Sequence, residues 1–150
     1  MNRVLLINGP NLNRLGKREP TVYGVETLES LEKKLDIFAK DQQVELHCFQ
    51  SNHEGEIIDK IHLAADNYDG VIINPGAFTH YSYAILDAIS SISTPVIEVH
   101  ISNVHARESF RHVSVTAPAT IGQIVGLGTY GYKLALLALI ENIRGSENNE

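Results

Sequence analysis

Short apolar runs alternate along the chain with longer stretches in which apolar residues recur every three or four positions. Short apolar runs of this kind are typical of buried strands, and the longer periodic stretches are typical of amphipathic helices. The runs predict strands over Arg3–Asn8, Val44–Phe49, Gly70–Asn74 and Val96–His100. We expect a fifth strand in the segment Val113–Ala117.

Four helices are predicted between and after these strands. Thr27 is placed to cap the first helix, which carries an apolar face from Leu28 to Phe38. The second helix holds the apolar residues Ile57, Ile58, Ile61, Leu63, Ala64 and Ala65, and the third runs from near Thr79 to Ile92. The last helix, around Leu134–Ile140, is apolar over much of its surface, so we expect it to be buried against the sheet or a partner subunit. The polar tail Gly145–Glu150 is expected to be a frayed, disordered end.

This alternation of strands and helices predicts an α/β fold with a parallel sheet covered by helices on both faces. With five strands, the expected order is 2-1-3-4-5, the flavodoxin-like arrangement. A length of 150 residues suits one domain, and the sequence shows no linker, repeat or low-complexity block. We therefore expect residues 1–150 to form a single catalytic domain.

Composition and charge exclude several classes of protein. The net charge of −6 argues against a nucleic-acid partner, and no apolar run approaches the length needed to cross a membrane. The chain enters its first strand at once, so we expect no signal or transit peptide. Cys48 is the only cysteine, which precludes an internal disulfide and fits a reducing cytoplasm. We expect Cys48 to be a small core residue rather than a catalytic thiol.

Polar side chains follow four of the predicted strands closely. Open parallel sheets bind their ligands beyond the carboxyl ends of the strands, so these residues define a candidate site. They are Asn8, Pro10, Asn11, Arg18 and Tyr23 after the first strand, Gln50, Ser51, Asn52, His53 and Glu54 after the second, Asn74, Pro75, Gly76, Thr79 and His80 after the third, and His100, Ser102, Asn103, Arg107, Glu108 and Arg111 after the fourth. Histidines and amides gathered at one sheet edge indicate a functional site.

The loop after the first strand carries an arginine and a tyrosine five residues apart, Arg18 and Tyr23. A guanidinium beside a phenol favours the phenolate and lowers its pKa, which is one way to obtain an oxygen base. A hydrogen-bonded surface loop is the alternative. In the fourth strand, Glu98 and His100 share a face because they lie two positions apart. Glu98 is then either the orienting partner of the imidazole or a surface charge on an edge strand.

Other motifs fit less well. Residues 126–131 match G-x-G-x-x-G, but no clear strand leads into them and no acidic ribose ligand follows, which favours close packing of the last helix. The spacing of Gly9 from Gly16-Lys17 does not make a phosphate-binding P-loop, and the seven histidines show no zinc-binding pattern, so we expect no metal. A flavin-binding electron carrier would need a Ser/Thr-rich first loop, and a receiver module would need acidic residues where Asn8 stands. A catalytically dead scaffold would not need Arg18, Tyr23 and His100.

The first loop, residues 7–24, resembles the signature of type II 3-dehydroquinate dehydratases. Segments 49–55, 73–80, 98–103, 107–111 and 126–136 match that family as well, so the resemblance covers nearly the whole chain. Departures are small: Arg14 replaces an apolar residue at a variable position, and Tyr81 replaces a common Thr or Ser, which we expect to alter the pocket wall.

The resemblance implies dehydration of 3-dehydroquinate to 3-dehydroshikimate in the shikimate pathway, with no cofactor. By the same resemblance, Tyr23 as phenolate removes the proton beside the substrate ketone, and Arg18 keeps it ionised. Asn11 positions a water at the oxygen of the enolate intermediate. His100 protonates the departing hydroxyl as general acid, and Glu98 orients it.

Substrate contacts are implied in the same way. The family pattern gives the carboxylate to Asn74, the backbone of Ile101 and the hydroxyl of Ser102, and the ring hydroxyls to His80 and Arg111. Asp87 sits on the third helix and reaches a site only from a neighbouring subunit, which fits the homododecamers, built from trimers, that the family forms. Arg107 is a second candidate cation near Tyr23.

Overall fold

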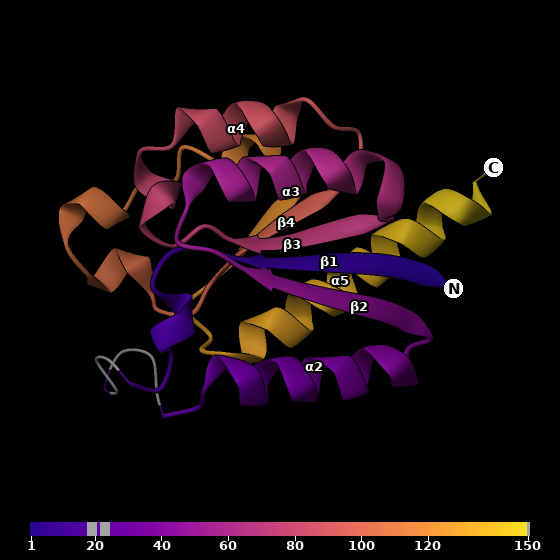
Figure 1. Cartoon of the computed structure of the whole chain (residues 1–150), viewed down its shortest axis with the longest axis horizontal. Helices are drawn as coiled ribbons and strands as arrows, with labels where there is room; N and C mark the ends of the chain where they lie inside the picture. Colours follow the sequence, from indigo (N-terminus) through magenta and orange to yellow (C-terminus); the bar gives the residue numbers. More distant parts are fainter. Residues whose placement is uncertain (18–20, 22–24, 150) are drawn as a thin grey trace.

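The computed structural model of the chain describes residues 1–17, 21 and 25–149. Its strands are β1 (Asn2–Asn8), β2 (Val44–Gln50), β3 (Gly70–Asn74), β4 (Val96–His100) and β5 (Gly122–Val125). They form one parallel sheet in the order β2-β1-β3-β4-β5 (Figure 1). The predicted flavodoxin-like fold and its strand order are therefore confirmed.

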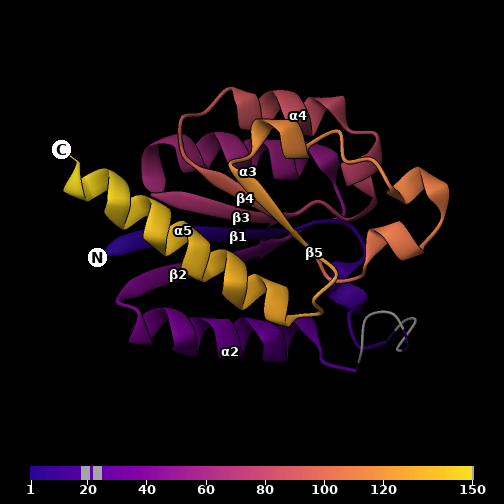
Figure 2. The same cartoon turned by 180° about the vertical axis from the view of Figure 1, so that it is seen from behind.

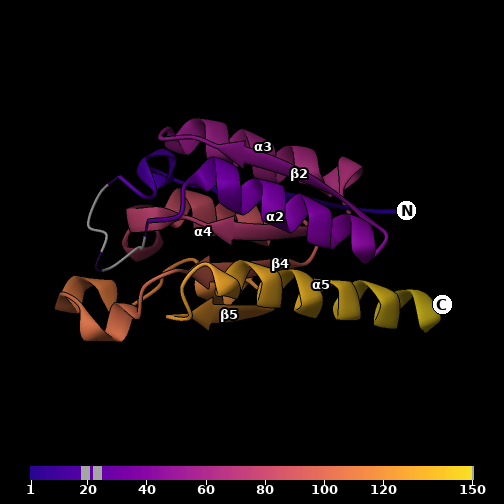
Figure 3. The same ribbon diagram turned by 90° about the horizontal axis from the view of Figure 1, so that it is seen from below.

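Helices cover both faces of this sheet. They are α2 (Leu28–Asp41), α3 (Glu54–Asn67), α4 (Tyr83–Ser90) and α5 (Tyr130–Asn148). Helices α3 and α4 lie on one face, while α2 and α5 lie on the other, as the front and back views show (Figures 1 and 2). Seen from below, α5 runs along β4 and β5 (Figure 3).

Alternation along the central strand β1 divides the core in two. Val4 and Leu6 point to the cluster beneath α2 and α5, whereas Leu5 and Ile7 point to the cluster beneath α3 and α4. All four side chains are at most 2% exposed. Burying one such side chain contributes about 1.5–3 kcal/mol, which is why a central strand apolar on both faces fixes the layers.

The start of α2 agrees with the predicted cap. The Thr27 hydroxyl accepts a hydrogen bond from the backbone N–H of Ser30 at 3.2 Å. The helix after β3 differs from the prediction, because residues Gly76–His80 form a separate 3-10 helix and α4 begins only at Tyr83. The hydroxyl of Ser82 accepts a hydrogen bond from the backbone N–H of Ile85 at 3.0 Å, so α4 has its own capping residue at this later start.

The fifth strand was predicted in the wrong segment. It is Gly122–Val125, which pairs with β4 in the register His100 to Val125, and not Val113–Ala117. The segment 113–117 is occupied otherwise: the hydroxyls of Ser114 and Thr116 donate to Glu98. A strand there would turn these contacts away from β4.

Two further expectations differ from the structure. Cys48 is exposed rather than a core residue, because it lies on the edge strand β2. Its thiol is nevertheless shielded beside α2, and this desolvation, together with Glu32 and Asp36, raises its pKa to about 12. At the other end of the chain, α5 continues through the polar residues from Gly145 to Asn148, where we expected fraying.

Candidate active site

The loops that follow β1 and β3 touch backbone to backbone. The N–H of Gly9 donates to the carbonyl of Asn74 at 2.7 Å. A Cβ at position 9 would lie 2.6 Å from the carbonyl oxygen of Pro75, so only glycine allows this approach. The contact brings the ends of the two central strands together at one edge of the sheet.

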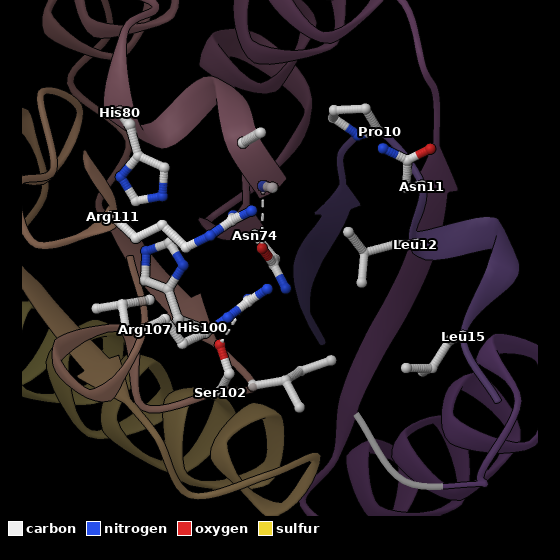
Figure 4. Close-up of a pocket in the computed structure, with 14 residues that line it drawn as sticks. Pro10, Asn11, Leu12, Leu15, Asn74, His80, His100, Ser102, Arg107 and Arg111 are labelled. Carbon is white, nitrogen blue, oxygen red and sulfur yellow. Dashed lines mark hydrogen bonds between the residues drawn. The ribbon is translucent and has the colours of Figure 1, made fainter. Parts of the chain in front are cut away.

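A cavity of about 120 Å³ opens above this contact (Figure 4). Its lining residues are Pro10, Asn11, Leu12, Leu15, Asn74, Gly76, Ala77, His80, His100, Ile101, Ser102, Val104, Arg107 and Arg111. Figure 4 shows His80, His100, Ser102, Arg107 and Arg111 gathered on one side, with Pro10, Asn11, Leu12 and Leu15 across from them. One wall is therefore basic and polar, and the other consists of an amide and apolar side chains.

Glu98 and His100 form a buried pair beside the cavity. Oε2 of Glu98 lies 2.9 Å from Nε2 of His100, and the two residues are 0% and 6% exposed. Glu98 also accepts hydrogen bonds from Ser114 at 2.8 Å, from Gln123 at 2.6 Å and from Thr116. Its position inside β4 is thus explained by these partners, and the alternative of a surface charge is wrong.

The electrostatics of the pair follow from these contacts. Burial alone would raise the pKa of Glu98, but the hydrogen bonds from His100 and Thr116 outweigh it and hold the pKa below the usual carboxyl value. A carboxylate only accepts, so Nε2 of His100 carries the hydrogen in this contact. The ring is fixed through Nε2, and Nδ1 is left as the nitrogen that can act on a ligand.

His80 and Arg111 lie on the same wall. Nδ1 of His80 donates to the carbonyl of Val113 at 2.9 Å. Burial lowers the pKa of His80, and the nearby His100 and Arg111 lower it further. A neutral His80 presents Nε2 as an acceptor for a hydroxyl. Arg111 is held by Glu108, with 2.7 Å between Nε and Oε2, and its guanidinium stacks on the ring of Phe110.

A buried chain of polar groups holds Asn74 in place. Its amide nitrogen donates to the hydroxyl of Tyr132 at 2.9 Å, and that hydroxyl donates to Oδ1 of Asn8 at 2.6 Å. Oδ1 of Asn74 accepts from the N–H of Gly76 at 3.1 Å. Desolvation raises the pKa of Tyr132, so it stays a neutral hydrogen-bonding phenol. Tyr132 was not among the predicted site residues; the signal for it was a tyrosine just ahead of the apolar run of the last helix.

Three further predicted residues line the cavity. Ser102 accepts a hydrogen bond from Nη1 of Arg107 at 3.2 Å, and Ile101 precedes it in the chain. Asn11 has a left-handed backbone, with φ of 71°, and its N–H donates to Oδ1 of Asn52 at 2.9 Å. Asparagine tolerates this conformation, which turns the chain over the end of β1.

Other predicted residues lie elsewhere. Asp87 is on the exposed side of α4, outside the cavity of its own chain. Tyr81 is 59% exposed and does not line the cavity, so the expected change to the pocket wall is wrong. Gln50 instead supports the first loop by donating to the carbonyl of Gly9 at 3.2 Å. Arg18 and Tyr23 lie outside the described residues.

The glycine-rich segment 126–131 also needs a correction. A strand does lead into it, since β5 ends at Val125. A Cβ at position 131 would meet Ile124 and Val99 at ordinary contact distance, and the segment leads into α5 rather than lining the cavity. Among residues 1–17, 21 and 25–149, no helix is both long and apolar enough to cross a membrane, and no group of His, Cys, Asp or Glu is arranged to hold a metal ion.

A flavodoxin-like sheet whose strand ends carry a buried Glu–His pair, a neutral histidine and two arginines defines an α/β enzyme suited to acid–base chemistry on a small anionic ligand. Comparison with known proteins narrows this class. The family model "Dehydroquinase class II" matches residues 2–140. The chain belongs to the class II dehydroquinase family, and it is an enzyme of the hydro-lyase type. The resemblance seen in its motifs is confirmed.

Individual relatives agree over almost their full length. A protein of Anoxybacillus flavithermus named 3-dehydroquinate dehydratase is 67% identical over 145 residues, which are 97% of this chain and 98% of that protein. A Bacillus cereus protein of the same name is 69% identical over 144 residues, 96% of this chain and 99% of that protein. The crystal structure of type II dehydroquinase from Butyrivibrio crossotus has a TM-score of 0.91 at 56% identity, covering 92% of this chain and 97% of that one.

Proposed function

We propose that this protein converts 3-dehydroquinate to 3-dehydroshikimate and water in the shikimate pathway, by anti elimination through an enolate. The names of its close relatives support this substrate. The reaction removes a proton beside a ketone and a hydroxyl from the neighbouring carbon. Substrate equals product plus water, with no change of oxidation state, so the proposal requires a base, an acid and an anion site but no cofactor.

The observation that carries the proposal is the buried Glu98–His100 pair at the cavity wall. His100 is the general acid that protonates the departing hydroxyl through Nδ1, because Nε2 is engaged with Glu98. Glu98 is a buried acceptor shielded from water, so it orients the ring of His100 through the hydrogen bond to Nε2. Its three further donors keep the carboxylate in one orientation.

The base is assigned from the family motif. Tyr23, ionised beside Arg18, removes the proton next to the ketone, and Arg107 supplies a second cation near this oxygen. Asn11 positions a water that hydrogen-bonds to the enolate oxygen. Asn11 follows β1 and His100 ends β4, and both line one cavity, which suits attack and departure on opposite faces of a ring.

The same cavity offers groups for the rest of the substrate. Asn74, the backbone of Ile101 and the hydroxyl of Ser102 hold the carboxylate. His80 and Arg111 hold the ring hydroxyls: neutral His80 accepts through Nε2, and Arg111 donates. This division places the one full negative charge of the substrate beside side-chain amide, backbone and hydroxyl donors.

The remaining assignments concern the assembly. We place the enzyme in the cytoplasm, as one catalytic domain per chain, and we assign it a homododecamer built from trimers. Asp87 supports the assembly because it is exposed on α4 and outside its own cavity, so it contributes to a site only across a subunit boundary. Sedimentation analysis of the purified protein tests the dodecamer directly.

The test of the function is the ultraviolet absorbance of the conjugated enone formed from 3-dehydroquinate. Replacing Tyr23 with Phe removes the base but not the substrate contacts, so turnover is expected to disappear while binding is largely retained. Tyr81→Phe is the matched control, because Tyr81 is exposed and outside the cavity. Activity of Tyr23→Phe near the wild-type rate would refute the assigned base, and a wild-type protein inactive on this substrate would refute the function.

A further inference from the structure

The backbone at Gly16 lies against the backbone of Val25 and Glu26. Gly16 has a left-handed backbone with φ of +83°. A Cβ at this position would lie 2.8 Å from the carbonyl oxygen of Val25 and 2.9 Å from that of Glu26. Leu15, the residue before, is only 2% exposed. Gly16 and the pair Val25–Glu26, which flank the segment holding Arg18 and Tyr23 in the sequence, are therefore in direct backbone contact.

Glu26 is paired with a lysine of α2 and lies close to the start of α5. Its Oε2 lies 2.5 Å from Nζ of Lys34 on α2. Thr129, the residue before α5, lies close to the same carboxylate and lines the same cavity. Together they line a cavity of about 290 Å³ between the two helices, along with Leu31, Leu35, Phe38, Tyr130 and Lys133. Figure 2 shows the beginnings of α2 and α5 near each other.

Comparison with a neighbouring ion pair shows that the side chain of Glu26 is unusually shielded for a paired glutamate. Glu29 pairs with Lys33 on the same helix at 3.2 Å, and its side chain is 80% exposed. The side chain of Glu26 is only 19% exposed. Burial acts to raise the pKa of Glu26, yet the bond from Lys34 and the nearby Thr129 hold the pKa below its usual value. Exposed pairs such as Glu29–Lys33 contribute little to stability, so this pair is a good reference for a merely stabilising role.

We propose that Glu26 is a positioning residue for the reaction: its carboxylate fixes the base of the stretch that carries Arg18 and Tyr23 against α2 and α5. The inference rests on the proposed function, because it concerns where those two side chains are held relative to His100. Glu26 itself does not line the substrate cavity. It acts by setting the position of the chain, and a misplacement of about 1 Å in a catalytic group costs on the order of a hundredfold in rate.

The first experiment compares Glu26→Ala with the matched variant Glu29→Ala. Both remove one glutamate that pairs with a lysine of α2. For Glu26→Ala we expect kcat to fall by about tenfold or more, with KM within about threefold of wild type because Asn74, His80 and Arg111 are untouched. For Glu29→Ala we expect both constants to stay at wild-type values. Equal kcat values for the two folded variants would overturn the inference.

Trypsin supplies a readout that does not depend on activity, since Lys17 and Arg18 are cleavage sites next to Gly16. We expect Glu26→Ala to be cut there about tenfold faster than Glu29→Ala, because loss of the anchor raises local opening. Equal cutting would overturn the inference even if the protein did not act on 3-dehydroquinate. An inactive wild-type protein would instead refute the proposed function.

Exchanging the two charges of the Glu26–Lys34 pair distinguishes the effect of the ion pair from other effects of substituting Glu26. Glu26→Lys alone places two like charges together and is expected to lower kcat at least as much as Glu26→Ala. Adding Lys34→Glu restores the opposite charges, so we expect part of the lost kcat to return. No recovery in the double variant would mean that the pair does not position the chain, which also overturns the inference.

Discussion

The ends of β2 and β4 carry similar residues but have different surroundings. Glu98 and His100 of β4 are buried, hydrogen-bonded to each other and placed at the cavity. His53 and Glu54, which follow β2, do not line it. The N–H of His53 donates to Ser51, and Glu54 accepts from Ser82 on the way into α4. A histidine and a glutamate near a strand end are thus not enough to define a site.

The difference follows from the place of each strand in the sheet. β1 and β3 are neighbours, and β4 adjoins β3, so their loops meet over one edge. The connections from β1 lead to one side of the sheet and those from β3 to the other, which opens a crevice where they diverge. β2 is the edge strand beyond β1, and its polar residues instead support the first loop, as Asn52 does for Asn11.

The largest effect is expected when the histidine near the end of each of these two strands is replaced in turn. His100→Asn removes the general acid, and we expect kcat to fall by about 10²–10⁴-fold. His53→Asn is the matched change after β2 and should leave kcat near the wild-type value. Steady-state kinetics on 3-dehydroquinate measure both. A comparable loss in the two variants would remove the distinction between the strand ends.

The glutamates should show the same contrast on a smaller scale. Glu98→Gln removes the charge and replaces one acceptor oxygen with an amide NH₂ group. That group would face a side chain that also donates, from Ser114, Thr116 or Gln123. We expect kcat to fall about tenfold to a hundredfold and unfolding free energy to fall by about 1–3 kcal/mol. In Glu54→Gln, the bond to Ser82 is easily kept by the amide oxygen, so both quantities should change little. Kinetics and urea denaturation provide the measurements.

Acid stability tests the shielded carboxylate. Burial acts to raise the pKa of Glu98, but its hydrogen bonds outweigh this desolvation, so the pKa is lower in the folded protein than its usual value. Its stabilising contribution is therefore present above the usual carboxyl pKa and disappears as pH falls through the lowered value. A carboxyl pKa that is one pH unit lower in the folded protein than in the unfolded chain stabilises the fold by about 1.4 kcal/mol. Urea melts across the acid range should show a shallower loss of stability in Glu98→Gln than in wild type; identical slopes would contradict the assigned role.

The smallest effect is expected at the supporting end of β2. Asn52→Ala removes the acceptor for the N–H of Asn11 and for the side chain of Gln50. We expect a loss of about 1 kcal/mol in unfolding free energy and a change in kcat of only a few fold. Asn67→Ala is a suitable control, since the side chain of Asn67, at the end of α3, donates an exposed hydrogen bond to the carbonyl of Leu63. A loss of turnover as large as that of His100→Asn would show that β2 contributes to the reaction.

Much of the fold was predictable because its signals are local. The apolar runs of β1 to β4 and the Thr27 cap involve residues close together in the sequence, and all appear where expected. The fifth strand was not predictable in this way. Segment 113–117 and β5 have similar local preferences, and only the contacts of Ser114 and Thr116 with Glu98 decide between them.

Prediction of the site from the sequence was limited in the same way. Residue types after β1, β3 and β4 identified most of the cavity lining, including Asn74, His80 and His100. They did not reveal that Tyr132, far along the chain, holds Asn74, nor that Cys48 lies exposed on an edge strand. Contacts between residues more than fifty positions apart leave no periodic trace in the sequence.

The strand order, the family and the kinds of side chain presented at the sheet edge all follow from the order of residues, because strand patterns and strand-end motifs are short-range features. Three-dimensional packing was needed to establish which strand ends meet over the cavity and which donors surround Glu98. Those donors come from sixteen to twenty-five residues further along the chain. Their arrangement depends on the pairing of β4 with β5 and on the packing of the loop between them, and the hydrogen bonds made in that packing outweigh burial and hold the pKa of Glu98 below its usual value.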